Sequence, residues 1–263
     1  MVILLTGASS GIGAATAKVL CEEGHKVYGT YRSNPPKDPC FVPVYMDVAD
    51  EASVRAAIEK VVSEQGRLDA LVNNAGMGIA GAVELTSETE AALQLNVNYL
   101  GALTVTRIAL PALRESGGRI LCVSSLAAQI PIPFQALYSA SKAALEITMQ
   151  ALEMECRPFG VRCTCVELGD TKTEFTKNRR YANGTAGDTV YAERFKKSVE
   201  RMERDEQSGY DPKMAARFIA KQLKRRNPPP IAACGAFPKI AYFLKKILPL
   251  RWANAVVGRM YAK

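Results

Sequence analysis

The chain has 263 residues, 48% of them hydrophobic, and a formal net charge of +8 at pH 7. This length and composition suit one globular domain with a sizeable core, and the lack of any apolar run near about 18 residues excludes a membrane-spanning helix. A single histidine and seven scattered cysteines exclude a zinc site and indicate reduced thiols. With no signal peptide before the first predicted strand, we expect a cytoplasmic protein.

The first elements predict a dinucleotide-binding turn. A short apolar strand from Val2 to Leu5 runs into a glycine-rich turn, and an amphipathic helical pattern follows. Glycines at such a turn let the backbone approach a pyrophosphate closely, and the N-terminus of the helix offers unpaired N–H groups and a positive dipole end. The turn consists of Thr6-Gly7-Ala8-Ser9-Ser10-Gly11-Ile12-Gly13.

Strands and helices then alternate along the chain. Strands are predicted at 27–31, 41–46, 68–73, 118–124 and 161–168, and helices at 51–65, 95–115 and 135–157. Alternation at this pitch predicts a parallel sheet covered by helices on both faces. Because no repeat or low-complexity linker interrupts it, we expect a single domain over residues 1–263.

Three polar residues in the second half of the chain form a pattern with acid–base chemistry. Tyr138 and Lys142 lie four residues apart, and therefore on one helix face, and Ser125 lies thirteen residues before Tyr138. A free tyrosine has a pKa of about 10, so its phenol needs a neighbouring ammonium group to exchange protons near pH 7. Lys142 is predicted to supply that group.

These motifs, together with Asn73-Asn74-Ala75-Gly76 and with Asn98 before Gly101, follow the order and spacing of the short-chain dehydrogenase/reductase family, which the chain resembles from residue 1 to about 175. The resemblance implies an α/β protein, a single-domain Rossmann fold with a seven-stranded parallel sheet and helices on both faces. To this the chain adds a helical C-terminal extension. The resemblance also implies an NAD(P)-dependent enzyme that assembles into homodimers or homotetramers by pairing the helices at 98–115 and 138–157.

The resemblance further implies roles for individual residues. Tyr138 would exchange the proton of the substrate oxygen, and Ser125 would hold that oxygen. Lys142 would favour the tyrosinate and bind the nicotinamide ribose, and Asn98, preferred over Asn96 for its spacing to Gly101, would relay protons through water to Lys142. The residues expected to contact the cofactor are Gly7, Ser9, Ser10, Gly11, Ile12, Gly13, Arg32, Asp47, Val48, Asn74, Ala75, Gly76, Tyr138, Lys142, Gly169, Thr171 and Thr173.

The end of the second strand favours NADP(H) over NAD(H). In NAD-binding Rossmann proteins an acidic residue there holds the ribose hydroxyls, whereas residues 28–33 of this chain include Arg32 and Ser33 and neither Asp nor Glu. Arginine suits the geometry of a 2′-phosphate. The alternative is that Arg32 is an exposed loop charge, and Ser10 stands where many NADP-preferring relatives carry Lys or Arg.

Three expected cofactor contacts have simpler alternatives. Asp47 would contact the adenine, or it would cap the helix that follows. Thr173 would contact the carboxamide, or it would start the next turn. Gly169 follows the sixth predicted strand, but Leu168 replaces the proline of the family, which leaves the path of this loop open.

Residues 174–211 are predicted to form a substrate lid. A turn at 183–187 precedes a charged helix at 188–207, whose apolar residues are expected to pack on the body of the protein and, as a group, to wall the pocket. Asp211 and Pro212 then start a helix that runs towards Arg226 and is ended by the prolines at 228–230. The apolar residues of the charged helix are Tyr191, Phe195, Val199 and Met202.

The C-terminal segment is strongly basic. Residues 212–263 contain twelve Lys or Arg and no Asp or Glu, and within them 237–263 form an amphipathic extension. Such a segment can lie on an anionic membrane surface; the alternative is packing on its own subunit or on a partner subunit. No nucleic-acid-binding module accompanies the charge, so no nucleic-acid partner is expected. The apolar stripe is Ile240, Phe243, Leu244, Ile247 and Leu248, continued after Pro249 by Trp252, Val256 and Met260, with Lys239, Lys245 and Lys246 off the stripe.

The expected function is NADP(H)-dependent interconversion of a secondary alcohol and a ketone. The extension favours a lipophilic, steroid- or retinoid-like substrate, because relatives with such substrates often carry C-terminal additions. A first alternative is a reductase of 3-oxoacyl thioesters. A basic segment would also attract an acidic acyl carrier or a coenzyme A thioester. A second is a non-catalytic cofactor-sensing or scaffold protein, against which the intact set of Ser125, Tyr138 and Lys142 argues.

Overall fold

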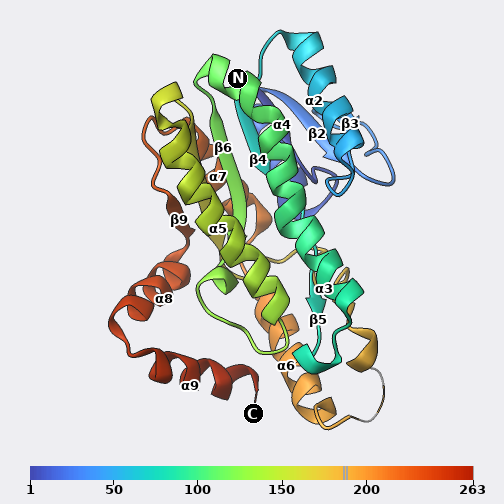
Figure 1. The fold of residues 1–263 in the computed structure, drawn as a ribbon, viewed down its shortest axis with the longest axis vertical. Helices are drawn as coiled ribbons and strands as arrows, with labels where there is room; N and C mark the ends of the chain where they lie inside the picture. The colour runs from blue at the N-terminus through green and yellow to red at the C-terminus, as the bar shows by residue number, and fades with distance from the viewer. Residues whose placement is uncertain (186, 188, 263) are drawn as a thin grey trace.

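The computed structural model describes residues 1–185, 187 and 189–262, apart from the side chain of Lys246. Helices and strands alternate as the sequence predicts (Figure 1). The strands are β1 (Val2–Leu5), β2 (Lys26–Tyr31), β3 (Val42–Tyr45), β4 (Ala70–Asn73), β5 (Ile79–Ala80), β6 (Arg119–Ser125), β7 (Arg162–Leu168), β8 (Arg180–Tyr181) and β9 (Ile231–Cys234). The α-helices are α1 (Gly11–Glu22), α2 (Glu51–Gln65), α3 (Glu88–Leu95), α4 (Gly101–Ser116), α5 (Ala136–Cys156), α6 (Ala192–Gln207), α7 (Pro212–Lys224), α8 (Ala236–Ile247) and α9 (Leu250–Tyr261).

The predicted seven-stranded parallel sheet is confirmed. Its strand order is β3-β2-β1-β4-β6-β7-β9, and every neighbouring pair is parallel. The chain order reverses at β1, which lies between β2 and β4, and such a switch point opens a crevice at the carboxyl ends of the strands. The glycine-rich turn follows β1 directly, so the fold places it at this crevice.

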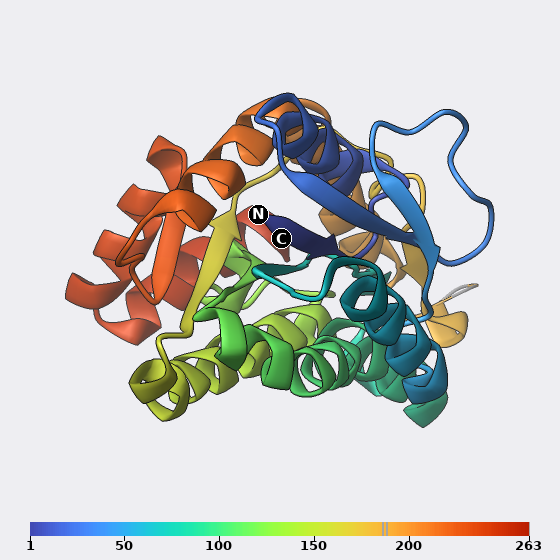
Figure 2. The ribbon, with the colours of Figure 1, turned by 90° about the horizontal axis from the view of Figure 1, so that it is seen from above.

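The sheet lies between two layers of helices, as Figure 2 shows from above, and an apolar cluster fills the space on each of its faces. On one face α1 and α7 pack through Leu20 and Ile219 against Leu5 and Leu121 of the sheet. On the other face α2, α4 and α5 cover the sheet. Five of the seven cysteines are buried and all seven carry free thiols.

One predicted helix is divided. The expected helix at 95–115 is observed as a π-helical turn at Asn96–Leu100 followed by α4, and a helix that was not predicted, α3, runs directly into that turn. The N–H group of Gly101 donates to the carbonyl of Asn96, five residues earlier, which inserts one extra residue into the turn. The other predicted boundaries agree to within two residues up to Leu168.

The segment after β7 follows the prediction in part. Asp211 caps α7 by accepting a hydrogen bond from the N–H of Lys213 at 2.7 Å, as expected. The predicted turn at 183–187 includes Ala186 and the predicted helix starts at Asp188, and both residues lie outside the described part of the chain. The helix observed there, α6, begins at Ala192.

The predicted C-terminal extension is helical and is divided at Pro249 into α8 and α9. Figure 1 shows both helices leaving the body below β9, with α9 returning towards α6. Among the described residues, no helix combines the length and the apolar character needed to cross a bilayer.

Candidate active site

The glycine-rich turn has a shape that only glycine permits. Gly7 and Gly11 have φ angles of 66° and 53°, in the left-handed region that favours glycine. A Cβ atom on Gly13 would lie 2.0 Å from the carbonyl oxygen of Gly7, so α1 packs directly on the turn. The N–H groups of the first turn of α1 therefore face the crevice, and this cradle fits the pyrophosphate of a dinucleotide.

The Asn-Asn-Ala-Gly motif braces this turn. The side-chain amide of Asn74 donates to the carbonyl oxygens of Thr6 and Gly7, each at 3.0 Å. The hydroxyl of Thr6 accepts the N–H groups of Asn74 and Ala75 at 2.9 and 3.0 Å. These hydrogen bonds join the turn after β1 to the end of β4, the bracing that the resemblance implies for this motif.

Ser125, Tyr138 and Lys142 converge beside the same crevice. Ser125 is the last residue of β6, and α5 presents Tyr138 and Lys142 one turn apart. The ammonium group of Lys142 donates to the carbonyl of Val123 at 2.8 Å and lies 5.9 Å from the centre of the Tyr138 ring. The structure therefore brings together the three residues that the sequence singled out for acid–base chemistry.

Burial dominates the protonation of this pair. It raises the pKa of Tyr138 to about 12, although a hydrogen bond with Ser125 lowers it. Burial also lowers the pKa of Lys142. In the protein without cofactor, Tyr138 is therefore a neutral phenol at pH 7, and the expected stabilisation of a tyrosinate by Lys142 stays a prediction.

The π-helical turn positions Asn98. Its side-chain amide donates to the carbonyl of Met77 at 2.9 Å and to the hydroxyl of Ser141 at 3.2 Å, and its oxygen accepts the N–H of Met77 at 2.8 Å. A Cβ atom on Gly76 would lie 3.4 Å from the Asn98 oxygen and 3.7 Å from the Lys142 nitrogen. Asn98 is buried beside Lys142, whereas Asn96 is exposed. These hydrogen bonds occupy the side chain of Asn98. A hydrogen-bonded connection from Asn98 to the catalytic group would therefore use the backbone of the π turn.

A buried carboxyl group behind Lys142 was missed from the sequence. Glu146 accepts hydrogen bonds from the hydroxyl of Ser124 at 2.6 Å and from the amide of Gln129 at 2.7 Å, and burial raises its pKa. Lys245 of α8 donates to Gln129 at 3.1 Å. The sequence signal was available, because Glu146 follows Lys142 by four residues and so shares its helix face.

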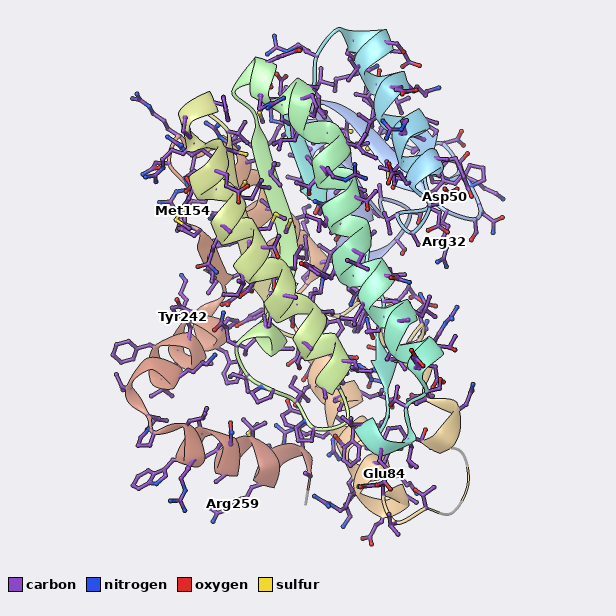
Figure 3. The ribbon with its side chains drawn as sticks, viewed as in Figure 1. Arg32, Asp50, Glu84, Met154, Tyr242 and Arg259 are labelled. Atoms are coloured by element: carbon purple, nitrogen blue, oxygen red, sulfur yellow. The ribbon has the colours of Figure 1, made fainter. Side chains whose placement is uncertain are left out.

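A cleft of about 750 Å³ contains the residues expected to contact the cofactor. It extends from the glycine-rich turn past Ser125 and Tyr138 to the lid and the C-terminal helices. Arg32 lies in it on the exposed loop after β2 (Figure 3). The expected contacts that line it are Gly7, Ser9, Ser10, Gly11, Ile12, Gly13, Arg32, Asp47, Val48, Asn74, Ala75, Gly76, Tyr138, Lys142, Gly169, Thr171 and Thr173.

The structure shows which local roles Asp47 and Thr173 have, while their contacts with the cofactor stay predictions. Asp50, and not Asp47, caps α2, and the carboxylate of Asp47 accepts the N–H of Ala49 at 2.9 Å within the cleft. The hydroxyl of Thr173 accepts the N–H of Phe175 at 3.2 Å, so Thr173 does start a turn while it lines the cleft.

The loop after β7 is covered by the C-terminal segment. A Cβ atom on Gly169 would lie 3.1 Å from Pro238 of α8, and one on Gly235 would lie 2.8 Å from the ring of Tyr210. The sequence left the path of this loop open, because Leu168 replaces the proline of the family. Contacts with α8 and with the end of the lid fix that path in the structure.

The lid walls the cleft with residues other than those expected. The ring of Phe175 lies 5.8 Å from that of Tyr138. Tyr191 and Phe195 instead pack edge-on against Phe134, with ring centres 6.4 and 5.6 Å away. The apolar residues of α6 are thus spaced for packing against Phe134 and not for lining the cleft. Cleft residues that the sequence did not single out include Asp170, Phe175, Glu206, Phe237, Val257 and Tyr261.

Known proteins resemble this chain over most of its length. A family profile described as "short chain dehydrogenase" matches residues 1–184. A 3-ketodihydrosphingosine reductase of Bacteroides thetaiotaomicron is 42% identical over 229 residues, which cover 87% of this chain and 85% of the relative.

Solved structures of short-chain dehydrogenases are also similar to this chain. A short-chain dehydrogenase from Streptomyces avermitilis has a TM-score of 0.82 and 31% identity, with 98% of this chain and 95% of that chain covered. A short-chain dehydrogenase from Burkholderia cenocepacia, solved in complex with NADP, has a TM-score of 0.78 and 26% identity, with 100% of this chain and 98% of that chain covered. With its glycine cradle, its Ser-Tyr-Lys group and these relatives, the chain belongs to the short-chain dehydrogenase/reductase family of NAD(P)-dependent oxidoreductases.

Proposed function

We propose that this enzyme interconverts a lipophilic ketone and the corresponding secondary alcohol with NADP(H), and that its substrate is a long-chain amino ketone of the keto-sphingoid type. The observation that carries the chemistry is the convergence of Ser125, Tyr138 and Lys142 on the cleft that contains the glycine cradle. The named activity of the 42% identical relative supports the substrate class.

Each residue of the catalytic group has a separate role in the proposed reaction. A nicotinamide cofactor held by the glycine cradle and by Lys142 would supply the hydride for reduction or accept it in oxidation. Ser125 holds the carbonyl oxygen, and the phenol of Tyr138 donates a proton to that oxygen during reduction and takes it back during oxidation. Lys142 binds the nicotinamide ribose and stabilises the tyrosinate that remains after the proton has left. Asn98 would act through the backbone carbonyl of the π turn, which would hold a water molecule that returns a proton to Lys142.

In the protein without cofactor, Tyr138 is in the protonation state that reduction needs. Its pKa is raised to about 12 by burial, so the proton-donating phenol predominates at neutral pH. Oxidation needs the tyrosinate and is therefore expected to accelerate as the pH rises, whereas reduction is expected to change little until the pH approaches the pKa of the phenol.

The proposed preference for NADP(H) rests on Arg32. Replacing Arg32 with Ala is expected to raise the KM for NADPH by roughly 10- to 100-fold, because a hydrogen bond between charged groups contributes about 1.5–3 kcal/mol. The KM for NADH should change little, and initial rates with both cofactors measure the difference. Lys37→Ala is the matched control, since Lys37 is an exposed basic residue of the same loop. An equal change in the KM for NADPH and for NADH would show that Arg32 does not recognise the 2′-phosphate.

Two carboxylates on the cleft wall support a substrate with a positive group. Asp170 and Glu206 both raise the pKa of Tyr138, so they lie within electrostatic range of the phenol. Glu206 is paired with Arg179. Desolvation and repulsion from Asp205 and Glu206 raise the pKa of Asp170 to about 6, and an ammonium group would relieve this cost. A keto-sphingoid base carries its amino group on the carbon next to the ketone.

Replacing Asp170 with Asn should therefore raise the KM for a long-chain amino ketone about tenfold, the effect of one hydrogen bond between charged groups. The KM for an uncharged ketone should stay within twofold of that of the unmodified enzyme, and steady-state kinetics on both substrates measure this. Asp38→Asn, which makes the same charge change on an exposed loop, serves as control. An equal rise in KM for both substrates would instead show that Asp170 maintains the structure of the site.

The proposed function is tested by oxidation of NADPH and NADH, followed at the absorbance of the reduced nicotinamide, with detergent-dispersed long-chain amino ketones, steroid and retinoid carbonyls and 3-oxoacyl thioesters. Turnover of the amino ketone with NADPH is the expected result. Preferential turnover of a steroid, a retinoid or a thioester would replace the substrate class. Cofactor binding without turnover of any of them would favour a sensing or scaffold role.

The proposed assembly is a homodimer or homotetramer through α4 and α5. Met154, 70% exposed, projects from the outer face of α5 in Figure 3, and Ile147 and Phe159 are exposed nearby in the chain. These large exposed apolar side chains, on α5 and on the short helical turn that follows it, support the α5 side of this interface. We place the enzyme in the cytoplasm, with the C-terminal helices as its contact with membranes.

A further inference from the structure

We propose that α8 and α9 form a docking platform for anionic membranes and that this platform opens the substrate cleft towards the lipid. The platform is defined as residues 236–261. Its role in delivering substrate rests on the proposed lipophilic substrate, whereas its binding to lipid does not.

The apolar stripe of α8 faces away from the protein. Ile240, Phe243 and Ile247 are 56, 62 and 59% exposed, so the stripe does not pack on its own subunit. One of the two alternatives that the sequence left for this segment, burial within its own chain, is therefore excluded for these residues. Apolar side chains at this spacing need an apolar partner, because exposing them to water is costly.

The outer face of α9 continues this surface. Trp252 and Val256 are 68 and 53% exposed and lie one helical turn apart. Arg259 lies one further turn along α9 and points away from the body in Figure 3. Tryptophan and arginine on one face of a helix are typical of helices at the boundary between lipid headgroups and acyl chains.

The charge of the platform identifies the partner. The segment 236–261 contains Lys239, Lys245, Lys246, Arg251 and Arg259 and neither Asp nor Glu, while residues 1–211 carry a net charge of −4. Lys239, Arg251 and Arg259 are exposed. A surface that combines aromatic, aliphatic and cationic side chains without acids complements an anionic bilayer. A second copy of this chain that paired through the same face would bring the same positive charge and would be repelled.

The platform also belongs to the wall of the cleft. Phe237 of α8 and Val257, Met260 and Tyr261 of α9 line the cleft that contains Tyr138. Phe237 is 56% exposed and precedes Ile240 by one turn, so apolar surface continues from the cleft to the outer stripe. A long-chain substrate dissolved in the bilayer could thus enter the cleft along α8 and α9 without crossing water.

The base of the platform is fixed to the catalytic domain. Pro238 packs on Gly169, Lys245 donates to Gln129 at 3.1 Å, and the hydroxyl of Tyr261 donates to Asp205 at 3.0 Å. These contacts hold the inner sides of both helices, so lipid binding on the outer side leaves the cleft formed.

The test uses Trp252, the only tryptophan of the chain, as the reporter in the unmodified protein without cofactor or substrate. Vesicles of phosphatidylglycerol and phosphatidylcholine are expected to shift its emission to shorter wavelength in a saturable manner. Lipids brominated on the acyl chain should quench it. Vesicles of phosphatidylcholine alone, or high salt, should weaken the response, because exposed charges are screened.

Variants separate charge from apolar contact. Arg251→Glu with Arg259→Glu should lower the partition coefficient at least about 25-fold, since each basic residue near an anionic surface contributes about fivefold. Ile240→Ser with Phe243→Ser should lower it in both vesicle types. Arg217→Glu with Lys221→Glu makes the same charge change on α7, where both residues are exposed, and should leave vesicle binding nearly unchanged. All six replaced side chains lie outside the cleft wall.

Co-sedimentation with vesicles and turnover of detergent-dispersed ketone are measured in parallel. Loss of vesicle binding with retained turnover in detergent supports the platform, and a gain in turnover when substrate is presented in anionic vesicles supports delivery. An unchanged Trp252 emission with anionic vesicles would overturn the proposal. So would a blue shift that appears without vesicles as the protein concentration rises, because it would assign the face to a second copy of the chain. Neither result depends on the identity of the substrate.

Discussion

Replacing Tyr138 with Phe should lower kcat by about 10²- to 10⁴-fold, the range expected when a general acid is removed. The ring remains to pack against Phe175 at 5.8 Å, so the fold and the cleft should be preserved. Stopped-flow measurement of ketone reduction gives the rate, and titration of NADPH fluorescence should give a Kd close to that of the unmodified enzyme. The expected combination is a bound cofactor without turnover.

The matched control is Tyr181→Phe. Its hydroxyl donates to Glu203 at 3.2 Å on the exposed surface of the lid, so its loss should leave kcat unchanged. Near-normal turnover in Tyr138→Phe would exclude this phenol as the proton donor. A loss of NADPH binding together with turnover would give Tyr138 a role in forming the cofactor site.

Replacing Gly13 with Ala should damage both stability and cofactor binding. The new Cβ atom would lie 2.0 Å from the carbonyl oxygen of Gly7 and 2.6 Å from the amide nitrogen of Asn74. Since the carbonyl belongs to the backbone of the cradle, α1 must move away from the turn. Overpacking of this kind costs roughly 1–3 kcal/mol, which lowers Tm by roughly 2–12 °C for a domain of this size. Calorimetry and NADPH titration measure the two effects.

Gly258→Ala is the control for this substitution. Gly258 lies within α9, and in the described part of the chain no atom outside its immediate surroundings comes within 4 Å of its added Cβ atom. Alanine favours a helix by up to about 1 kcal/mol over glycine, so this variant should be neutral or more stable. An unchanged Tm and Kd in Gly13→Ala would show that the turn adapts and that its glycines are not needed for the close approach of α1.

Local sequence signals predicted the site where the chemistry depends on fixed spacing. The strand, glycine turn and helix at the N-terminus, and the i, i+4 pair of Tyr138 and Lys142, bring their residues together through backbone geometry alone. Parallel strands then bring the two motifs to the same edge of the sheet. The fold, and those cleft residues that belong to the motifs, were accordingly within reach of the sequence.

The rest depends on contacts between distant segments. The raised pKa of Tyr138 reflects burial under Phe175 and neighbouring charges from the lid, which no local pattern contains. The extra residue in the turn at Asn96–Leu100 follows from hydrogen bonding of the backbone, and not from a composition signal. For α6 and α8 the periodicity was correct, but a period identifies an apolar face and not what covers it. The face of α6 covers Phe134, whereas that of α8 is exposed.

The contact of Pro238 with Gly169 also sets an order of events during synthesis. The glycine cradle and the sheet from β3 to β7 are complete once residue 168 has left the ribosome, but β9 and the cover of the Gly169 loop come from residues 231–238. Domains generally begin to fold while the chain is still being made. The nascent protein therefore passes through a stage in which β7 is paired only with β6 and the cofactor loop is uncovered. Translation of the segment leading into α8 supplies both the missing strand and the cover.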